Sequence, residues 1–330
     1  MYCFWYLGLL RAILGCNPLQ EVDCFVQNQA LGRDIERFES KSFKLTGDVD
    51  ITEEDSPEFK GANVKMSLNQ RFDNPMASSE FYILYGKVEC DIKASPGQGI
   101  ISSFYLQSDD LDEIDIAELF GGNTYQFQSN FFIKGNTTTW DRGGYHEIRN
   151  PIEFYNRYTV EWTPESIKWW CNEQLIRVLE KDNDYGIPRS PMAIKLSLWA
   201  GGDPSNAEGT ILWAGGLSDY REFPYVMNFR NLKVSDYSSG RIYSYGHKDG
   251  IWHGLSSDGV IGGRNFVTTS DYNFETSTDG FKGDENQFDK RENITSTTND
   301  SLKLSIPINT LLIMTITITI FFIPISLSSI

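Results

Sequence analysis

Six carboxylates lie within a run of ten residues that ends at Glu118. Branched apolar residues alternate with the acids in the middle of this run. Because side chains at i and i+2 share one face of a strand, Glu113 and Asp115 would project from one face and Ile114 and Ile116 from the other. A solvated acidic loop is the ordinary interpretation of an acid cluster, but such a loop has no need of interleaved branched residues. The run therefore predicts a strand with an acidic face.

Glu118 breaks the alternation, because its odd offset from Glu113 places it on the apolar face. One extra residue in the strand, a β-bulge near residues 116–117, would return Glu118 to the acidic face. Three carboxylates on one face repel one another, and this repulsion raises the pKa of at least one of them. A retaining glycosidase places an ionised carboxylate about 5–5.5 Å from a protonated one. A flat strand separates residues i and i+4 by roughly 13 Å, so this chemistry requires a bent or bulged strand.

The spacing Glu113-Ile-Asp115-Ile-Ala-Glu118 resembles the Glu-x-Asp-x-x-Glu signature of glycoside hydrolase family 16. Residues 99–113, which precede the motif, are similar to the fungal cell-wall Crh-type transglycosylases. The resemblance implies that Glu113 is the nucleophile, Glu118 the general acid/base, and Asp115 the residue that holds and electrostatically tunes the pair. Crh-type enzymes usually carry the shorter form Glu-x-Asp-x-Glu. A catalytically impaired, wall-anchored glycan-binding protein is therefore the alternative to an active enzyme.

The resemblance implies an extracellular retaining glycosidase/transglycosylase that cleaves chitin and transfers it to β-glucan, which would cross-link the fungal cell wall. In that reaction Glu113 forms a glycosyl intermediate, and Glu118 then deprotonates the acceptor. The expected partners are a chitin donor and a β-glucan acceptor. Nothing in the sequence by itself distinguishes a sugar acceptor from water, so a chitin or β-glucan hydrolase of the same family is a second alternative.

Further residues resemble sugar-binding positions of the family. The segments Trp199-Ala-Gly-Gly and Trp213-Ala-Gly-Gly are similar to Crh-type segments, and glycines beside a tryptophan leave its ring open to a flat ligand. As isolated residues, both tryptophans would be assigned to the core. Gln128 and Asn130 fall on one face of an expected strand, and the family equivalents contact sugar or the catalytic acids. Phe104 is assigned to the same cleft.

The composition fits a neutral polysaccharide better than nucleic acid. Aromatic residues make up 14% of the chain, which suits both a β-rich core and sugar stacking, and the net charge of −16 argues against a nucleic-acid partner. The three histidines lack the spacing of metal ligands, and no glycine-rich loop follows a strand and opens a helix. We therefore expect no metal and no cofactor.

The pattern of elements predicts an all-β fold. Short alternating strands separated by Gly, Pro and Asn turns, with almost no helical period, are typical of a sandwich. The family fold is a curved β-jelly-roll sandwich with an open substrate cleft, and we assign residues 16–236 to such a catalytic domain. Within it, the polar and glycine-rich residues 135–150 predict a surface loop.

The two ends of the chain carry targeting patterns. Residues 1–15 are apolar with a single charge and resemble a secretory signal peptide, complete or truncated. Residues 237–300 are rich in Gly, Ser, Thr, Asp and Asn, which predicts a low-complexity C-terminal stalk, although 241–266 retain enough apolar residues for some ordered structure. Residues 301–330 match a hydrophobic GPI-attachment signal, with a transmembrane anchor as the alternative. We expect a secreted protein that is GPI-anchored to the plasma membrane or cell wall.

Five cysteines agree with secretion, and a cleaved leader would remove the first of them. Among the other four, the resemblance implies a disulfide between Cys16 and Cys24. Cys90 and Cys171 both lie in expected strands, and they could form a second pair or remain two buried free thiols. Asn136 begins an Asn-Thr-Thr sequon and is the candidate glycosylation site.

Overall fold

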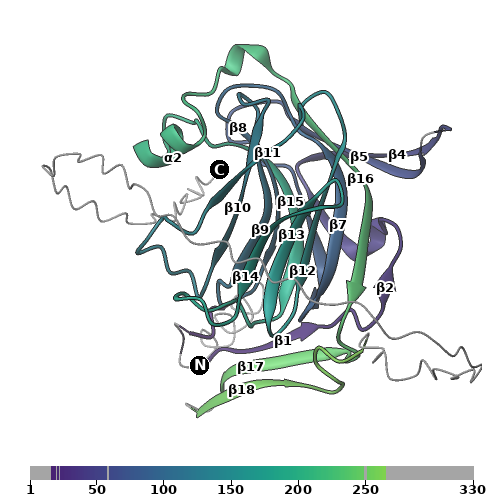
Figure 1. Ribbon diagram of the computed structural model, residues 1–330, viewed down its shortest axis with the longest axis vertical. Coiled ribbons are helices and arrows are strands. Elements are labelled where there is room, and N and C mark those ends of the chain that lie inside the picture. The colour runs from purple at the N-terminus through teal and green to yellow at the C-terminus, as the bar shows by residue number, and fades with distance from the viewer. Residues whose placement is uncertain (1–15, 20, 22, 58, 249–250, 265–330) are drawn as a thin grey trace, which may run out of the picture. The chain divides into compact units, whose positions relative to one another are not determined.

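Alternating apolar and polar residues build two antiparallel sheets that pack face to face in the computed structural model (Figure 1). The structure describes residues 16–264 except 20, 22, 58, 249 and 250. The predicted leader at 1–15, the predicted stalk beyond residue 264 and the predicted attachment signal at 301–330 lie outside the described residues. Within the part of the chain that is described, no helix is both long enough and apolar enough to cross a membrane.

The first sheet carries the acidic strand. Its seven strands lie in the order β11-β10-β9-β8-β15-β6-β3. In that order they span Gly144–Glu147, Gln126–Phe132, Glu113–Phe120, Ile100–Gln107, Met192–Ala200, Met76–Ile83 and Phe43–Thr46. The acidic run therefore forms β9, with β10 and β8 as its neighbours.

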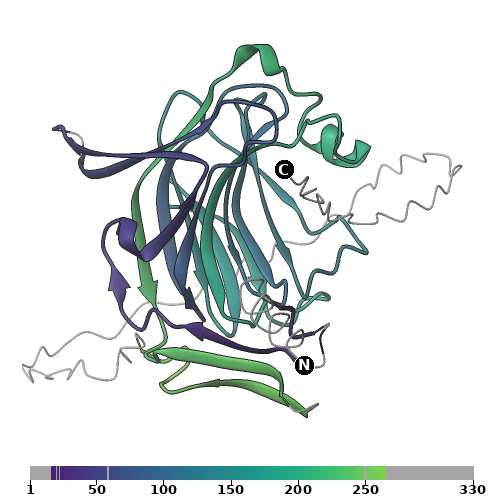
Figure 2. The same ribbon diagram turned by 180° about the vertical axis from the view of Figure 1, so that it is seen from behind.

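The second sheet covers one face of the first and has the order β14-β13-β12-β7-β16-β5-β4, with β2 paired beside β16. These strands span Gln174–Glu180, Ser166–Cys171, Asn156–Trp162, Gly86–Lys93, Tyr225–Asp236, Lys60–Leu68, Asp48–Asp55 and, for β2, Asp34–Ile35. The β4–β5 hairpin projects from the sandwich in both views (Figures 1 and 2).

A small third sheet and three short helices complete the described fold. The third sheet has the order β1-β17-β18, formed by Phe25–Gln29, Ile242–Lys248 and Ile251–Ser257. The helices are the 3-10 turns η1 (Ser40–Ser42) and η2 (Tyr220–Glu222) and the six-residue helix α2 (Glu208–Trp213). The predicted all-β jelly-roll sandwich is thus confirmed.

The hydrophobic core lies between the two large sheets, and it corrects one site prediction. Phe104 on β8 is 0% exposed and belongs to this core, so its assignment to the sugar cleft is wrong. The reason is the two-residue period of the strand: Ser103 and Tyr105 point to the outer face of the first sheet, and Phe104 between them points to the second sheet.

The structure resolves the alternatives for the two internal cysteines. Cys90 on β7 and Cys171 on β13 are both buried and free. Both pair with the same residue, Tyr158 on β12, one from each side. Two strand spacings of about 4.8 Å place them too far apart for a disulfide, which requires Cα atoms within roughly 7 Å.

The folded domain extends beyond the boundary predicted at residue 236. β17 and β18 lie within the stretch assigned to the stalk, and β17 pairs with β1 near the other end of the described chain. This segment is ordered because Tyr243 and Tyr245 are buried in the fold. The predicted disulfide between Cys16 and Cys24 is confirmed, with Cα atoms 5.8 Å apart.

The predicted surface loop at 135–150 also contains a strand. Gly144–Glu147 forms β11 and pairs with β10 at the edge of the first sheet. Asn136 is exposed in the loop before it, where its Oδ1 accepts hydrogen bonds from the backbone N and the Oγ1 of Thr138. Its glycosylation stays a prediction.

Candidate active site

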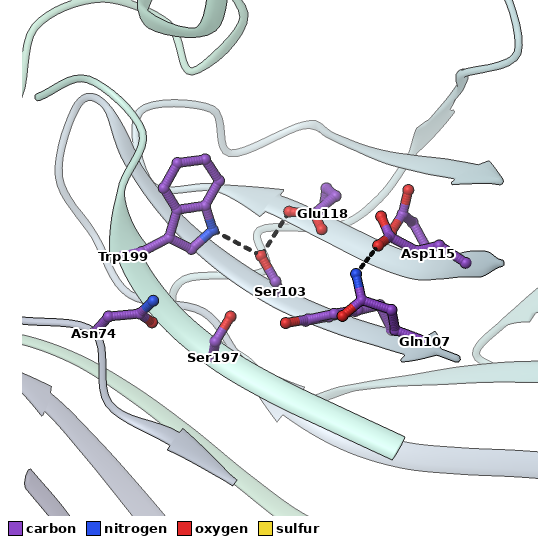
Figure 3. Close-up of a pocket in the computed structure, with 9 residues that line it drawn as sticks. Asn74, Ser103, Gln107, Asp115, Glu118, Ser197 and Trp199 are labelled. Carbon is purple, nitrogen blue, oxygen red and sulfur yellow. Dashed lines mark hydrogen bonds between the residues drawn. The ribbon is translucent and has the colours of Figure 1, made fainter. Parts of the chain in front are cut away.

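A cavity of about 240 Å³ opens on the outer face of the first sheet, the face that the second sheet does not cover (Figure 3). Residues from β8, β9 and β15 and from the segment before β6 line it: Asn74, Ser103, Tyr105, Gln107, Glu113, Asp115, Glu118, Ser197 and Trp199. All three acids of the predicted catalytic motif are therefore present in one cavity.

A β-bulge in β9 brings these acids together. On β8, Phe104 pairs with Ala117 and the next residue, Tyr105, pairs with Asp115, so Ile116 is the extra residue. The bulge predicted at 116–117 is thus confirmed. Its effect is to return Glu118 to the face that carries the other two acids, as the odd spacing required.

The second sheet holds the backbone at the bulge. A bulge interrupts the hydrogen-bond ladder, and Trp169 on β13 donates its Nε1–H to the main-chain oxygen of Asp115 at 3.1 Å. Trp169 is fully buried, and the guanidinium of Arg177 lies 4.8 Å from the centre of its ring. The position of Asp115 therefore depends on a side chain from the opposite layer of the sandwich.

Glu118 is held by a short chain of donors from neighbouring strands (Figure 3). Ser103 Oγ donates to Glu118 Oε2 at 2.7 Å, and Trp199 Nε1 donates to Ser103 Oγ at 3.0 Å. Burial raises the pKa of Glu118 to about 8, and the charge of Glu113 acts in the same direction against the hydrogen bond from Ser103. Glu118 is consequently protonated at neutral pH and can donate a proton.

Glu113 is surrounded by more groups that favour its ionised form. Gln107 Nε2 donates to Glu113 Oε2, and Lys195 Nζ donates to Gln107 Oε1 at 2.6 Å. Burial raises the pKa of Glu113, while hydrogen bonds from Asp115 and Gln107 and the positive charge of Lys195 oppose that rise. No basic side chain opposes the rise at Glu118 in this way, so Glu113 is the acid best placed to ionise.

Asp115 lies between the other two acids and is buried. Burial raises its pKa well above the ordinary value, and the charges of Glu113 and Glu118 raise it further, with a smaller opposing effect from Arg177. A protonated Asp115 donates its hydrogen bond to Glu113, which favours the ionised form of Glu113. The three acids can therefore provide one carboxylate and one proton donor on the same face.

The two predicted tryptophans form a stacked pair, but only one lines the cavity. Their ring centres are 6.0 Å apart with an interplanar angle of 25°. Trp199 lines the cavity, and Trp213, at the end of α2, lies on the side away from it and lines a different hollow. Trp213 Nε1 donates to Gln128 Oε1 at 3.0 Å.

Gln128 and Asn130 lie on β10 beside the acids without lining the cavity. Gln128 pairs with Glu118, and Asn130 pairs with Asp115. Gln128 orients Trp213, and Asn130 Oδ1 accepts the backbone N–H of Phe131 at 2.9 Å. Their direct contact with sugar stays a prediction.

Several functional candidates were missed by the sequence analysis. Ser103, Tyr105 and Gln107 alternate along β8 and all line the cavity. This polar alternation within an apolar strand is visible in the sequence and could have identified them. Lys195 and Ser197 alternate with buried apolar residues along β15 in the same way, whereas Asn74 lies in the segment before β6 and its local sequence carries no such signal.

Comparison with known proteins settles the family. Residues 43–215, more than half of the chain, match the model of glycosyl hydrolases family 16. The chain belongs to glycosyl hydrolase family 16. The fold described above and the acidic motif on β9 agree with this membership.

Proteins similar to this chain include Crh-like proteins of fungi. Crh-like protein CRH11 of Candida albicans is 48% identical over 252 residues, which cover 74% of this chain and 53% of the relative. A Crh-like protein of Arthroderma benhamiae is 39% identical over 267 residues, 77% of this chain and 72% of the relative. The chain spans about half the length of the Candida relatives that it matches.

A solved structure supports the same grouping. The structure described as Crh5 transglycosylase in complex with NAG is 36% identical, with a TM-score of 0.64, and the match covers 74% of this chain and all of that chain. The predicted resemblance to the Crh-type members of family 16 is therefore confirmed.

Proposed function

We propose that this family 16 protein is a retaining transglycosylase that cleaves chitin and transfers the released chain to β-glucan. The observation that carries the proposal is the bulge in β9, which presents Glu113 and Glu118 in one cavity with different donors around them. The similarity to a transglycosylase whose structure holds NAG supports a donor that contains N-acetylglucosamine.

The first step cleaves the donor. The carboxylate of Glu113 attacks the anomeric carbon, and the bond from that carbon to the glycosidic oxygen breaks. Glu118 gives its proton to the departing oxygen, which leaves as a sugar hydroxyl. The product is a glycosyl ester on Glu113, and Glu118 is now ionised.

The second step forms the new linkage. Ionised Glu118 removes the proton from an acceptor hydroxyl, whose oxygen attacks the anomeric carbon and displaces the carboxylate of Glu113. Both acids return to their starting states. Asp115 donates to Glu113 in the resting site and would release that hydrogen bond as Glu113 bonds to the sugar.

Two alternatives compete with this proposal. A hydrolase would use water in the second step, with the same three acids. The longer motif would also fit a glycan-binding protein without activity, but the bulge absorbs the extra residue, and this favours an enzyme.

We also propose that the protein acts outside the cell and is attached through a GPI signal in residues 301–330. The disulfide in the described domain supports an oxidising compartment.

The test of the proposed reaction uses the full chain with a chito-oligosaccharide donor and a fluorescent laminari-oligosaccharide acceptor. Labelled hybrid products that disappear in Glu113→Gln support a retaining transglycosylase. Shortened donor without hybrids indicates a hydrolase, and sugar binding without turnover indicates a lectin-like protein. Hybrid formation by Glu113→Gln at the wild-type rate contradicts the assigned nucleophile.

A further inference from the structure

Three polar side chains form a line across neighbouring strands of the first sheet, from Glu113 on β9 through Gln107 on β8 to Lys195 on β15. Gln107 lies directly opposite Glu113 in the pairing of β8 with β9. Lys195 lies directly opposite Tyr105, two residues before Gln107 on the same face of β8, and a long side chain can span that diagonal. The strand register therefore places the amide of Gln107 between the lysine and the carboxyl.

Lys195 is connected to the catalytic cavity but is not part of its wall. Gln107 lines the cavity and points toward the acids of β9 (Figure 3), whereas Lys195 does not line it. The Lys195 side chain is half-buried, with its Nζ 5.9 Å from the centre of the Tyr105 ring. Among the described residues, Gln107 Oε1 is the acceptor of its hydrogen bond, at 2.6 Å. Lys195 therefore acts on the site through Gln107 and not by touching a bound sugar.

Two acids face Lys195, and neither takes its hydrogen bond. Burial lowers the pKa of Lys195, and the charges of Glu113 and Asp109 oppose that effect. The oxygens of Asp109 already accept hydrogen bonds from two other side chains, both at 2.8 Å. Glu113 accepts its hydrogen bond from Gln107. The lysine thus reaches the carboxyl of Glu113 by way of the amide.

The other titratable groups that face Glu113 come from β8 and β9. Asp115 and Glu118 lie on its own strand, and burial raises the pKa of both. On β8, burial and the charge of Glu113 raise the pKa of Tyr105, so its hydroxyl is neutral. Among the described groups, Lys195 is therefore the positive charge that acts on Glu113.

The amide of Gln107 has one accepting end and one donating end, and each neighbour needs a different end. A lysine ammonium only donates hydrogen bonds, so Oε1 must face Lys195. Nε2 is then left to face Glu113, where it donates to a carboxylate oxygen. A protonated Glu113 would instead donate to Oε1, which requires the amide to turn over and leaves Lys195 without its acceptor.

We infer that Lys195 is a positioning residue, which locks the amide of Gln107 so that this amide can only donate to Glu113. The lock favours the ionised form of Glu113, because a hydrogen bond from a donor stabilises a carboxylate. The inference rests on the proposed function, since it takes Glu113 as the nucleophile.

The test follows the ionisation of Glu113 by carbon NMR in the full chain with labelled carboxyls, and Glu113→Gln assigns the signal. Lys195→Met keeps an unbranched side chain and removes the donor. It is expected to raise the pKa of Glu113 by about one unit, a tenfold change in ionisation, and to move the acid limb of kcat/KM upward by the same amount. Lys195→Arg keeps a donor and is expected to stay close to the wild type.

A double-mutant cycle tests whether the effect passes through the amide. Gln107→Met breaks the line of hydrogen bonds and leaves Lys195 in place. In that background, Lys195→Met is expected to shift the pKa of Glu113 by less than about half as much as it does in the wild type. An undiminished shift would mean that the lysine acts by its charge alone, and it would overturn the role of the amide.

A matched control removes a lysine from the other large sheet. Lys233→Met on β16 removes a cation that pairs with Glu89 at 3.5 Å, and it is expected to leave Glu113 and the acid limb unchanged. The inference is overturned if Lys195→Met leaves the pKa of Glu113 unchanged or lowers it, or if Lys195→Arg shifts it as far as Lys195→Met does. Because the NMR titration needs no turnover, the expected shifts in a protein that transfers no sugar would contradict the proposed function and leave the inference standing.

Discussion

Two groups of acids stand side by side in one stretch of ten residues and have opposite surroundings. Asp109, Asp110 and Asp112 precede β9, and we call them the turn acids. Glu113, Asp115 and Glu118 lie on β9, and we call them the strand acids. Asp109 on the turn accepts hydrogen bonds from Asn28 and Tyr82, both at 2.8 Å.

The other two turn acids are satisfied even more completely. Asp110 accepts from Lys134 Nζ and Ser190 Oγ, both at 2.8 Å. Asp112 accepts the backbone N–H groups of Lys134, Arg189 and Ser190 at 2.9, 2.7 and 3.0 Å. The strand acids have fewer donors and one another as neighbours, and burial raises the pKa of all three. Donor supply, rather than burial, thus separates structural acids from proton carriers.

The largest expected effect is the loss of activity when Glu118 is replaced by a side chain that cannot transfer a proton. Glu118→Gln should lower transfer about 10²–10⁴-fold, the usual worth of a general acid/base. It should not destabilise the fold, because an amide replaces a carboxyl that is already neutral at pH 7. Transfer rates and urea denaturation measure the two effects, with Glu53→Gln on the exposed β4 as the control.

Stability should also depend on pH through Glu118. Its folded pKa of about 8 lies above its ordinary value near 4.5, so the unfolded chain binds fewer protons between these values. The free energy of unfolding should therefore fall as pH rises from about 4.5 to 8, and Glu118→Gln should flatten that fall. An equal slope in both proteins would contradict the raised pKa.

Replacing a turn acid should have the reverse effect: the free energy of unfolding should fall, and activity should be affected less directly. Asp112→Ala leaves three buried backbone N–H groups without their acceptor and should cost about 3–5 kcal/mol in the free energy of unfolding. Asp109→Ala should cost less, about 1–2 kcal/mol, since its donors are two side chains, which can reorient, rather than three fixed backbone groups. Equal losses for the two variants would show that donor type is irrelevant.

A smaller effect is expected at the bulge. Trp169→Phe keeps an aromatic ring in the core and removes only the donor to the main-chain oxygen of Asp115. It should cost about 1–3 kcal/mol in stability, and transfer should fall by about ten- to hundredfold because the acids are misplaced. Trp162→Phe, which removes the donor to the main-chain oxygen of Pro188 and leaves the contact to Asp115 in place, should cost stability alone. Unchanged transfer in Trp169→Phe would show that the hydrogen bond from Trp169 is not needed to position the acids at the bulge.

The smallest effect is a shift in the pH profile. The hydrogen bond from Ser103 lowers the pKa of Glu118, so Ser103→Ala should move the basic limb of kcat/KM upward by up to about one pH unit. Ser197→Ala, in the same cavity but without that bond, should leave the limb in place. A downward shift in Ser103→Ala would contradict the assigned hydrogen bond.

The parity of residues along a strand predicted much of the site. The offset between Glu113 and Glu118 required a bulge, and the structure has one at Ile116. The same two-residue rule places Phe104 in the core, but its assignment to the cleft relied on family resemblance and was wrong. Local periodicity was therefore a better guide to which face a side chain takes than resemblance was.

Other features depend on contacts that no local pattern encodes. Composition placed the end of the domain at residue 236, yet β17 pairs with β1 across more than two hundred residues and buries Tyr243. Lys195 reaches Gln107 from β15, and Trp213 reaches its hollow from a six-residue helix. Such contacts become visible only after the strands are ordered into a sheet.

The most direct test of the proposed proton donor is the titration of Glu118 itself. A carboxyl-labelled full chain is titrated by carbon NMR, and Glu118→Gln assigns the signal that disappears. The Glu118 signal is expected to titrate near pH 8, while Glu113 ionises at lower pH. A Glu118 signal that titrates near 4.5, or one that ionises before Glu113, would contradict the assignment of proton donor and carboxylate.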